Sequence, residues 1–202
     1  MSNINYFRSL DVSVKDCLVK AKSLLNCNSK ELPYLLGQLE IESMGFTRMR
    51  ENLYYSSVQR IVDTFPRVKA LAGISHVRNP EALGELLYGK YEFRGYGGIQ
   101  LTWEGNHNAF FDAYNRPHGD YKDGEGVAQV NDFWLTTAYY FTLMQTKLTD
   151  SDYNNVTSCA LKYGRLINRG INSKPNAITL DSVGRVRATK QWIGVCNQNG
   201  IV

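Results

Sequence analysis

Apolar residues recur at helical spacing along most of the chain. Leu32, Leu35, Leu36 and Leu39 form one such stripe within residues 31–43, because positions i, i+3, i+4 and i+7 share a helix face. Similar patterns predict helices over residues 56–66, 79–89, 104–117, 127–144, 156–168 and 181–196. The segment 127–144 is apolar on nearly every side, which is typical of a buried central helix. We therefore expect a mainly α protein, with residues 1–202 forming a single domain that has room for two lobes.

Residues that typically cap or break helices support several of these helix boundaries. Asn79 is suited to cap the helix that starts at Pro80, and Gly89 is suited to end it. A serine precedes the stripe that starts at Val58, and Pro66 stops it. These signals place the helix ends independently of the apolar pattern.

Two segments break the helical pattern. The run EFRGYGGIQLTW, residues 92–103, reads as a short extended stretch with three glycines. Glycine weakens a strand, so such a run usually marks a bend or a place where another group approaches the backbone. NRGINSKPN, residues 168–176, reads as a polar loop between helices. Catalytic groups often lie on loops held by a rigid scaffold, so both segments are candidates for a binding groove.

Composition narrows the classes of partner. The net charge of +4 is small and dispersed, so we expect no nucleic-acid partner. No run of about 18 apolar residues occurs, so we expect no stable membrane insertion. The first residues lack a signal-peptide pattern, so we expect the chain to be made in the cytosol. Four cysteines without CxxC spacing and three scattered histidines predict buried thiols and no metal site.

Two acidic residues raise the question of glycoside chemistry. Cleavage of a glycosidic bond needs a carboxylic acid beside the leaving oxygen and usually a second group across the sugar. On a helical wheel Glu42 lies about 20° from Leu35, beside the apolar stripe, and Glu40 lies about 40° from Leu36. Spacing alone favours Glu42 slightly as the acid, and it leaves open that Glu42 and Glu40 are both solvated charges. The generous aromatic content, 12% with 13 Tyr, suits either a core or a groove that stacks carbohydrate.

The order of motifs adds a resemblance. The run ESMGF, ENLYYSS, NPEALGELLYG and FRGYGGIQLT, between residues 37 and 102, resembles the family-19 chitinase-like glycoside hydrolases, and especially the lysozyme-like bacteriophage endolysins among them. A weaker match follows in LINRGINSKPNAITLDSVGR. The resemblance implies a lysozyme-like or chitinase-like two-lobed helical domain, with the glycine-rich segment lining a substrate groove.

The resemblance also implies site residues. Glu42 stands at the position of the general acid, and Glu51 at that of the second acidic residue, a general base or water-orienting group. The expected substrate contacts are Tyr55, Ser56, Arg94, Tyr96, Gln100, Thr102 and Asn172. By contrast, we expect Arg185 and Arg187 on a solvent-exposed helix face.

This sequence departs from the family pattern at several positions. They are Ile41, Met44, Tyr54, Tyr96, Gly98, Trp103, Ser173 and Lys174. Trp103, for example, replaces the glycine that ends the glycine-rich run. Neither carboxylate is lost, so the departures bear on the number of sugar subsites and on substrate preference.

The implied function is an endolysin that hydrolyses the β-1,4 bond of peptidoglycan glycan strands with inversion. It would need no cofactor or metal, act as a monomer, and wait in the host cytoplasm until released onto the periplasmic wall. Three alternatives stay open: a chitinase, a lytic transglycosylase that needs only one carboxylate, and a catalytically silent glycan-binding or virion protein. Glu51 separates the lytic transglycosylase from the hydrolases, because a hydrolase should require this residue and a transglycosylase should not.

Overall fold

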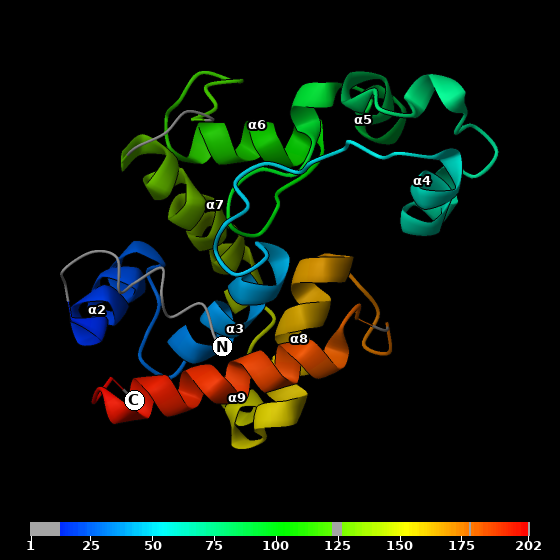
Figure 1. Ribbon diagram of the computed structural model, residues 1–202. Helices are drawn as coiled ribbons and strands as arrows, with labels where there is room; N and C mark the ends of the chain where they lie inside the picture. Colours follow the sequence, from blue (N-terminus) through cyan, green and yellow to red (C-terminus); the bar gives the residue numbers. More distant parts are fainter. Residues whose placement is uncertain (1–12, 123–126, 178, 202) are drawn as a thin grey trace.

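The computed structural model describes residues 13–122, 127–177 and 179–201 (Figure 1). This described part is mainly helical, as predicted, and holds no sheet; its only β pairings are isolated bridges, Arg50 with Tyr96 and Tyr96 with Leu101. The α-helices are α2 (Val14–Leu24), α3 (Leu32–Glu42), α4 (Val58–Thr64), α5 (Pro80–Tyr88), α6 (Glu104–Ala113), α7 (Val127–Gln145), α8 (Val156–Arg169) and α9 (Ser182–Gln198). Short 3-10 turns lie at Pro66–Val68, Ile74–His76, Tyr91–Phe93 and Asp150–Asn154.

Capping residues fix the helix ends that the sequence predicted. The Asn79 side chain accepts a hydrogen bond from the backbone N–H of Ala82 at 3.2 Å, and Gly89 ends α5 with a φ of 82°. Helix α2 lies outside the predicted helices. Its N-cap is Ser13, whose hydroxyl accepts a hydrogen bond from the N–H of Asp16. Its apolar residues do recur at helical spacing: Cys17, Leu18 and Ala21 are buried, and Val14 and Leu24 pack against the larger cluster.

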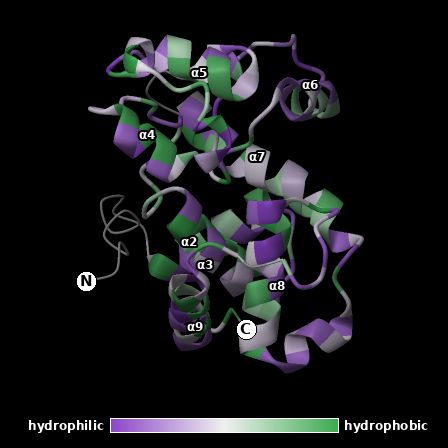
Figure 2. Ribbon diagram, turned by 90° about the vertical axis from the view of Figure 1, so that its right-hand side faces the viewer, coloured by the Kyte–Doolittle hydropathy of each residue, from purple (hydrophilic) through white to green (hydrophobic). Residues whose placement is uncertain are grey.

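The buried residues form two hydrophobic clusters. The larger one draws on α2, α3, α6, α7, α8 and α9. The smaller one contains Leu53, Ile61, Val68, Leu83, Leu87, Tyr88 and Phe93, so α4, α5 and two of the 3-10 turns surround it. Figures 1 and 2 show α4 and α5 at one end of the molecule, α8 and α9 at the other, and α7 between them.

The helix α3 lies directly against α9. A Cβ added to Gly37 would lie 2.6 Å from Oγ1 of Thr189, so only glycine allows this approach of the two helices. The contact aligns the end of α3, where Glu42 lies, with the first turns of α9. Close packing of these helices therefore positions one of the two carboxylates.

The long helix α7 is mostly buried, as its apolar pattern predicted. Phe133, Phe141 and Met144 are among its core residues, but Val130 and Leu143, near its two ends, are 39% and 41% exposed. Cysteine thiols also fill the core: Cys17, Cys159 and Cys196 are buried and Cys27 is half-buried. Burial raises the pKa of the Cys159 thiol to about 12.

Candidate active site

Glu42 is the last residue of α3, where the chain reverses sharply. The buried Ser43 hydroxyl donates to the carbonyl of Leu39 at 2.5 Å and accepts from the N–H of Phe46 at 2.8 Å, which closes the turn. Met44, Gly45 and Phe46 all have positive φ values. This turn carries the chain from α3 toward Glu51 within nine residues of Glu42.

An arginine of α9 holds the Glu42 carboxylate. Nη2 of Arg185 donates to Oε1 of Glu42 at 2.6 Å, and the exposed fractions of the two side chains are 2% and 17%. Nη1 of Arg185 donates to the buried Gln38 at 2.8 Å, and its Nε donates to the carbonyl of Leu180 at 2.8 Å. The expectation that Arg185 lies on a solvent-exposed face is wrong, whereas Arg187 is exposed as expected. Glu42 therefore lies against a buried charge and not only against apolar surface.

The alternative carboxylate on α3 points elsewhere. Oε2 of Glu40 accepts a hydrogen bond from the indole N–H of Trp192 at 2.7 Å. Trp192 is 4% exposed and belongs to the larger cluster, so this contact ties Glu40 to the core of α9. Glu40 therefore has a structural partner in the helix pair and serves as a comparison for Glu42.

Glu51 is fixed by the glycine-rich segment and by α5. Its Oε2 accepts from the N–H of Gly95 at 3.1 Å, and its Oε1 accepts from the Tyr88 hydroxyl at 3.1 Å. The N–H of Glu51 donates to the carbonyl of Gly95 at 2.9 Å, so backbone and side chain both attach to the same residue. Burial, with the Glu51 charge, raises the pKa of Tyr88 well above its usual range. Tyr88 thus remains a donor to Glu51, a role that the sequence did not indicate.

The glycine-rich segment folds back on itself and does not form a strand. Tyr96 and Leu101 exchange backbone hydrogen bonds of 2.9 and 2.8 Å, and Gln100, between them, has a φ of 56°. Nε2 of Gln100 donates to the carbonyl of Gly97 at 2.8 Å. A Cβ added to Gly95 would lie 2.8 Å from Oε1 of Gln100 and 3.1 Å from Cβ of Glu51. The Gln100 amide and Glu51 therefore both lie next to Gly95.

One acceptor in this segment is left without a protein partner. Oε1 of Gln100 is buried, and no donor within the described residues bonds to it. Buried polar atoms are nearly always satisfied by protein, water or ligand. Its position beside Gly95 and Glu51 is therefore suited to accept a hydrogen bond from a buried water molecule.

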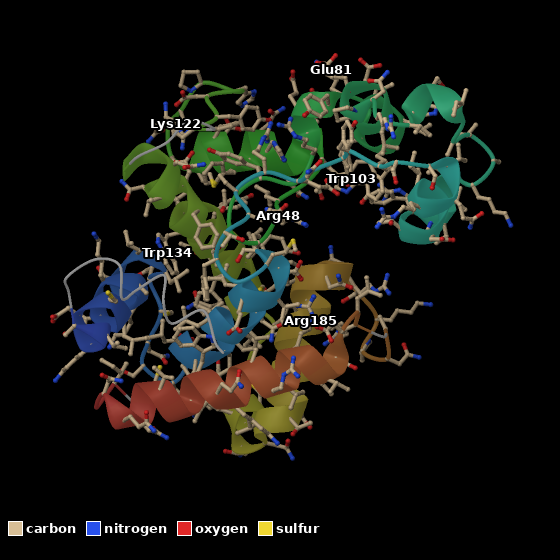
Figure 3. The ribbon with its side chains drawn as sticks, viewed as in Figure 1. Arg48, Glu81, Trp103, Lys122, Trp134 and Arg185 are labelled. Atoms are coloured by element: carbon tan, nitrogen blue, oxygen red, sulfur yellow. The ribbon has the colours of Figure 1, made fainter. Side chains whose placement is uncertain are left out.

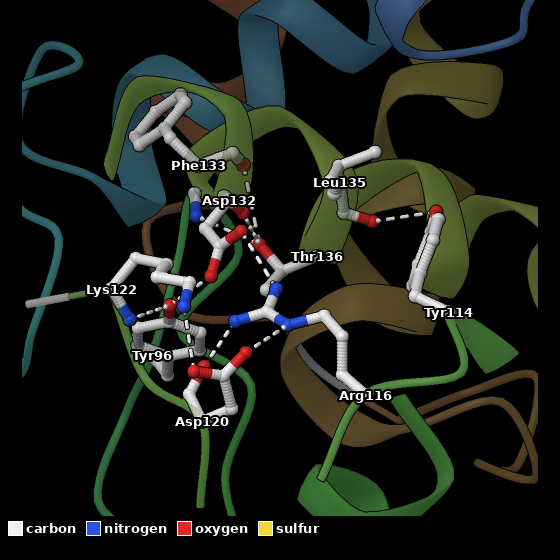
Figure 4. Close-up of polar contacts among 10 residues, drawn as sticks. Tyr96, Tyr114, Arg116, Asp120, Lys122, Asp132, Phe133, Leu135 and Thr136 are labelled. Atoms are coloured by element: carbon white, nitrogen blue, oxygen red, sulfur yellow. Dashed lines mark hydrogen bonds and ion pairs between the residues drawn. The ribbon is translucent and has the colours of Figure 1, made fainter. Parts of the chain in front are cut away.

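Tyr96 lies in the core and not in a groove. Its ring is 1% exposed, its hydroxyl donates to Asp132, and it accepts from the N–H of Lys122 at 2.8 Å (Figure 4). Asp132 also pairs with Arg116 at 2.8 Å. As placed, Tyr96 has no surface to offer a substrate, which corrects its assignment as a contact residue. It instead anchors the glycine-rich segment to α7.

The remaining predicted contacts fall into two places. Tyr55 is half-buried against Phe65 with ring centroids 5.7 Å apart, and Ser56 is exposed and accepts from Arg60 at 3.4 Å. Arg94 is half-buried, with its guanidinium 3.8 Å from the centre of the Tyr91 ring. Tyr55 packs against the smaller hydrophobic cluster, and Arg94 contacts Tyr91, which packs against the same cluster. Burial raises the pKa of Tyr55, and the nearby Glu51 charge acts in the same direction.

Thr102, Gln100 and Asn172 border a continuous depression. A hollow of about 310 Å³ contains Gln100 and Thr102, and a neighbouring one of about 680 Å³ contains Asn172. Both hollows are lined by Asn106, Tyr140, Arg169 and Gly170. Burial raises the pKa of Tyr140, and the Glu42 charge acts in the same direction, although Glu42 itself lines neither hollow. Three of the expected contact residues therefore line these hollows, together with residues of α7 and α8 that the sequence did not single out.

Other kinds of site find no support in the described residues. Among them, no group of three His, Cys, Asp or Glu side chains is placed to hold a metal ion, and none of the helices is long and apolar enough to cross a bilayer. No protein-family model and no curated protein matches the sequence.

Proposed function

We propose that this protein is a glycoside hydrolase of the phage endolysin type that cleaves the β-1,4 bond of bacterial peptidoglycan with inversion. The observation that carries the proposal is that Glu42 and Glu51 are held separately on either side of one tight turn. Arg185 of α9 binds one carboxylate, while Tyr88 of α5 and the backbone of Gly95 bind the other. We further propose that the helical architecture around them is lysozyme-like, with two lobes and the groove between them.

The proposed roles follow the contacts of each carboxylate. Oε1 of Glu42 is bound by Arg185, and its Oε2 has no hydrogen-bond partner among the residues described. Oε2 would therefore face the substrate and give its proton to the glycosidic oxygen as the bond from C1 to that oxygen breaks. Glu51 would take a proton from the water whose oxygen attacks C1 from the opposite face. Oε1 of Gln100, buried beside Glu51, would orient that water.

The test is mass spectrometry of the soluble products released from purified peptidoglycan. Wild type is expected to release muropeptides with intact reducing ends. Glu42→Gln and Glu51→Gln should each lower the rate by about 10²–10⁴-fold, the usual contribution of a general acid or base. Glu40→Gln is the matched control, because Glu40 lies on the same helix but contacts Trp192, and its rate should stay near that of wild type.

The other outcomes separate the alternatives. Anhydro products that persist in Glu51→Gln would identify a lytic transglycosylase, since that reaction needs no second carboxylate. Cleavage of chitin without any release from peptidoglycan would identify a chitinase. Tight binding to the glycan by wild type, with no product from either polymer, would identify a glycan-binding protein and contradict the proposed chemistry.

A further inference from the structure

Trp103 differs from the other two tryptophans in its exposure. It is 45% exposed, while Trp134 and Trp192 are 5% and 4% exposed. Its ring meets the ring of Tyr88 edge-on, with centroids 5.3 Å apart and planes at 82°, and the Arg67 guanidinium lies 5.0 Å from its centre. The Arg67 guanidinium lies over one face of the ring, and these contacts hold its orientation while 45% of the residue stays exposed.

The backbone at this position does not favour a tryptophan. Trp103 has a φ of 75° and a ψ of 140°, close to a region that is essentially confined to glycine. It is also the N-cap of α6, where no side-chain hydrogen bond is made and where tryptophan lacks the capping oxygen of the preferred residues. A glycine would suit both demands better. An outlier of this kind points to a role for the side chain itself.

The exposed ring borders the hollow beside the candidate active site. Trp103 lines the 310 Å³ hollow together with the polar side chains of Gln100, Thr102, Asn106 and Arg169. In the view of Figure 3 it lies below α5 and above Arg185. An aromatic face ringed by hydrogen-bonding groups matches a pyranose, which presents C–H groups on its faces and hydroxyls at its edge. The electron-rich face of the indole attracts such C–H groups.

We propose that Trp103 is the stacking platform of a saccharide subsite that binds a β-linked N-acetylhexosamine ring of the glycan strand. The sugar class rests on the proposed function. All ring substituents of a β-linked glucosamine are equatorial, so its faces are flat enough to lie against an indole. The same Tyr88 that contacts the Trp103 ring donates its hydroxyl to Glu51. A sugar stacked on Trp103 is thus aligned with the carboxylate that acts on its neighbour.

The first experiment measures binding without turnover. The N-acetylglucosamine hexamer is titrated into the Glu42→Gln protein, and tryptophan emission and its quenching by iodide are followed. Because the other two tryptophans are buried, shielding of the quenchable emission reports Trp103. Adding Trp103→Gly should weaken hexamer binding by about three- to tenfold, as expected for one aromatic stacking contact. Trp103→Tyr should restore most of the affinity, and Ile74→Ala, which alters another exposed apolar residue, should have no effect.

Thermal melting separates binding from packing. Trp103→Gly should melt at or above the wild-type temperature, because glycine relieves the backbone at this position. If Trp103→Gly melts lower and Trp103→Tyr binds the hexamer no better than Trp103→Gly, the ring serves packing alone and the inference is overturned.

Initial rates on peptidoglycan keep the two proposals apart. In the otherwise wild-type enzyme, Trp103→Gly should raise the half-saturating substrate concentration more than it lowers the maximal rate. If wild type is active and Trp103→Gly matches it at every concentration, the subsite is overturned and the proposed function stands. If no variant is active but the hexamer shields Trp103, the subsite stands and the hydrolase fails. If the wild-type protein binds neither the hexamer nor peptidoglycan, the subsite is overturned.

Discussion

Arg185 and Glu42 form an ion pair of 2.6 Å between residues 143 positions apart, one on α9 and the other at the end of α3. The guanidinium is buried and makes two further hydrogen bonds, to Gln38 and to Leu180. Since Arg presents its donors in a fixed fork, it can hold Glu42 and brace the junction of the two helices at the same time. The pair therefore links stability to the geometry of the candidate site.

Replacing Arg185 with methionine should destabilise the protein by roughly 2–4 kcal/mol, because Glu42 and the buried Gln38 lose their partner. Arg185→Lys should cost less, since it keeps the charge but cannot reproduce all three hydrogen bonds. Urea unfolding measures both. Arg187→Met, on the exposed side of the same helix, is the control and should change stability by less than about 0.5 kcal/mol. Equal effects at the two arginines would contradict the buried role of Arg185.

Tyr88→Phe removes the hydroxyl that donates to Glu51. A hydrogen bond to a charged group contributes about 1.5–3 kcal/mol, so a catalytic Glu51 that loses this donor should slow the reaction by roughly tenfold or more. The measurement is the initial rate of peptidoglycan cleavage. Tyr54→Phe, at a tyrosine that is 57% exposed, should leave the rate unchanged. An unaltered rate in Tyr88→Phe would mean that Glu51 does not depend on this contact.

Gly97→Ala should be strongly destabilising. Its φ is 73°, and an added Cβ would lie 1.9 Å from Oγ1 of Thr136 on α7. Gly119 has a similar φ of 81° but nothing within 4 Å of the added atom, so Gly119→Ala should cost only the backbone strain, about 1–2 kcal/mol. The difference between the two variants in urea unfolding isolates the steric clash. Variants of equal stability would show that the glycine-rich segment can move away from α7.

Stability should fall between about pH 6.5 and pH 4 because of His107. Its Nε2–H donates to the carbonyl of Leu101 at 2.7 Å, and its Nδ1 lies 2.6 Å from the Tyr121 hydroxyl. Burial, together with the charges of Arg50 and Arg94, lowers the pKa of His107 to about 4. The unfolded chain, with an ordinary histidine pKa near 6.5, therefore binds more protons in this window. The free energy of unfolding should drop by up to about 3 kcal/mol as the pH falls through it.

Urea unfolding at pH 7, 5.5 and 4.5 measures this dependence. His107→Gln retains a donor for Leu101 but does not titrate, so the loss of stability over this range should shrink. His118→Gln, at an exposed histidine paired with Asp112, is the control and should retain the wild-type dependence. A His107→Gln protein with the full pH dependence would assign the effect to other groups.

The sequence predicted best what is encoded locally. Asn79, Pro80 and Gly89 determine the ends of α5 through hydrogen bonds and φ values within a few residues. The same holds for Ser57, which caps α4. Such signals need no knowledge of the rest of the fold, and the structure confirms them.

Features set by distant contacts escaped the sequence. The buried face of α9 contains Arg185 and Thr189 beside Ala188, Trp192 and Cys196, so apolar spacing alone does not reveal it. Tyr96 was expected in a groove, but the chain reversal between Tyr96 and Leu101 places its ring beneath the segment. The order of the motifs singled out Glu42, Glu51, Gln100, Thr102 and Asn172. The contacts of Arg185 and Tyr88 with these carboxylates, in contrast, are seen only in the folded structure.

The distance in sequence between Glu42 and Arg185 determines when, during synthesis, their contact can form. During synthesis α3 emerges long before α9, and a growing chain that ends short of α9 lacks the group that holds Glu42. Domains fold as units once their segments are available. The contact that holds Glu42 therefore forms only after α9 has been synthesised and has docked on α3.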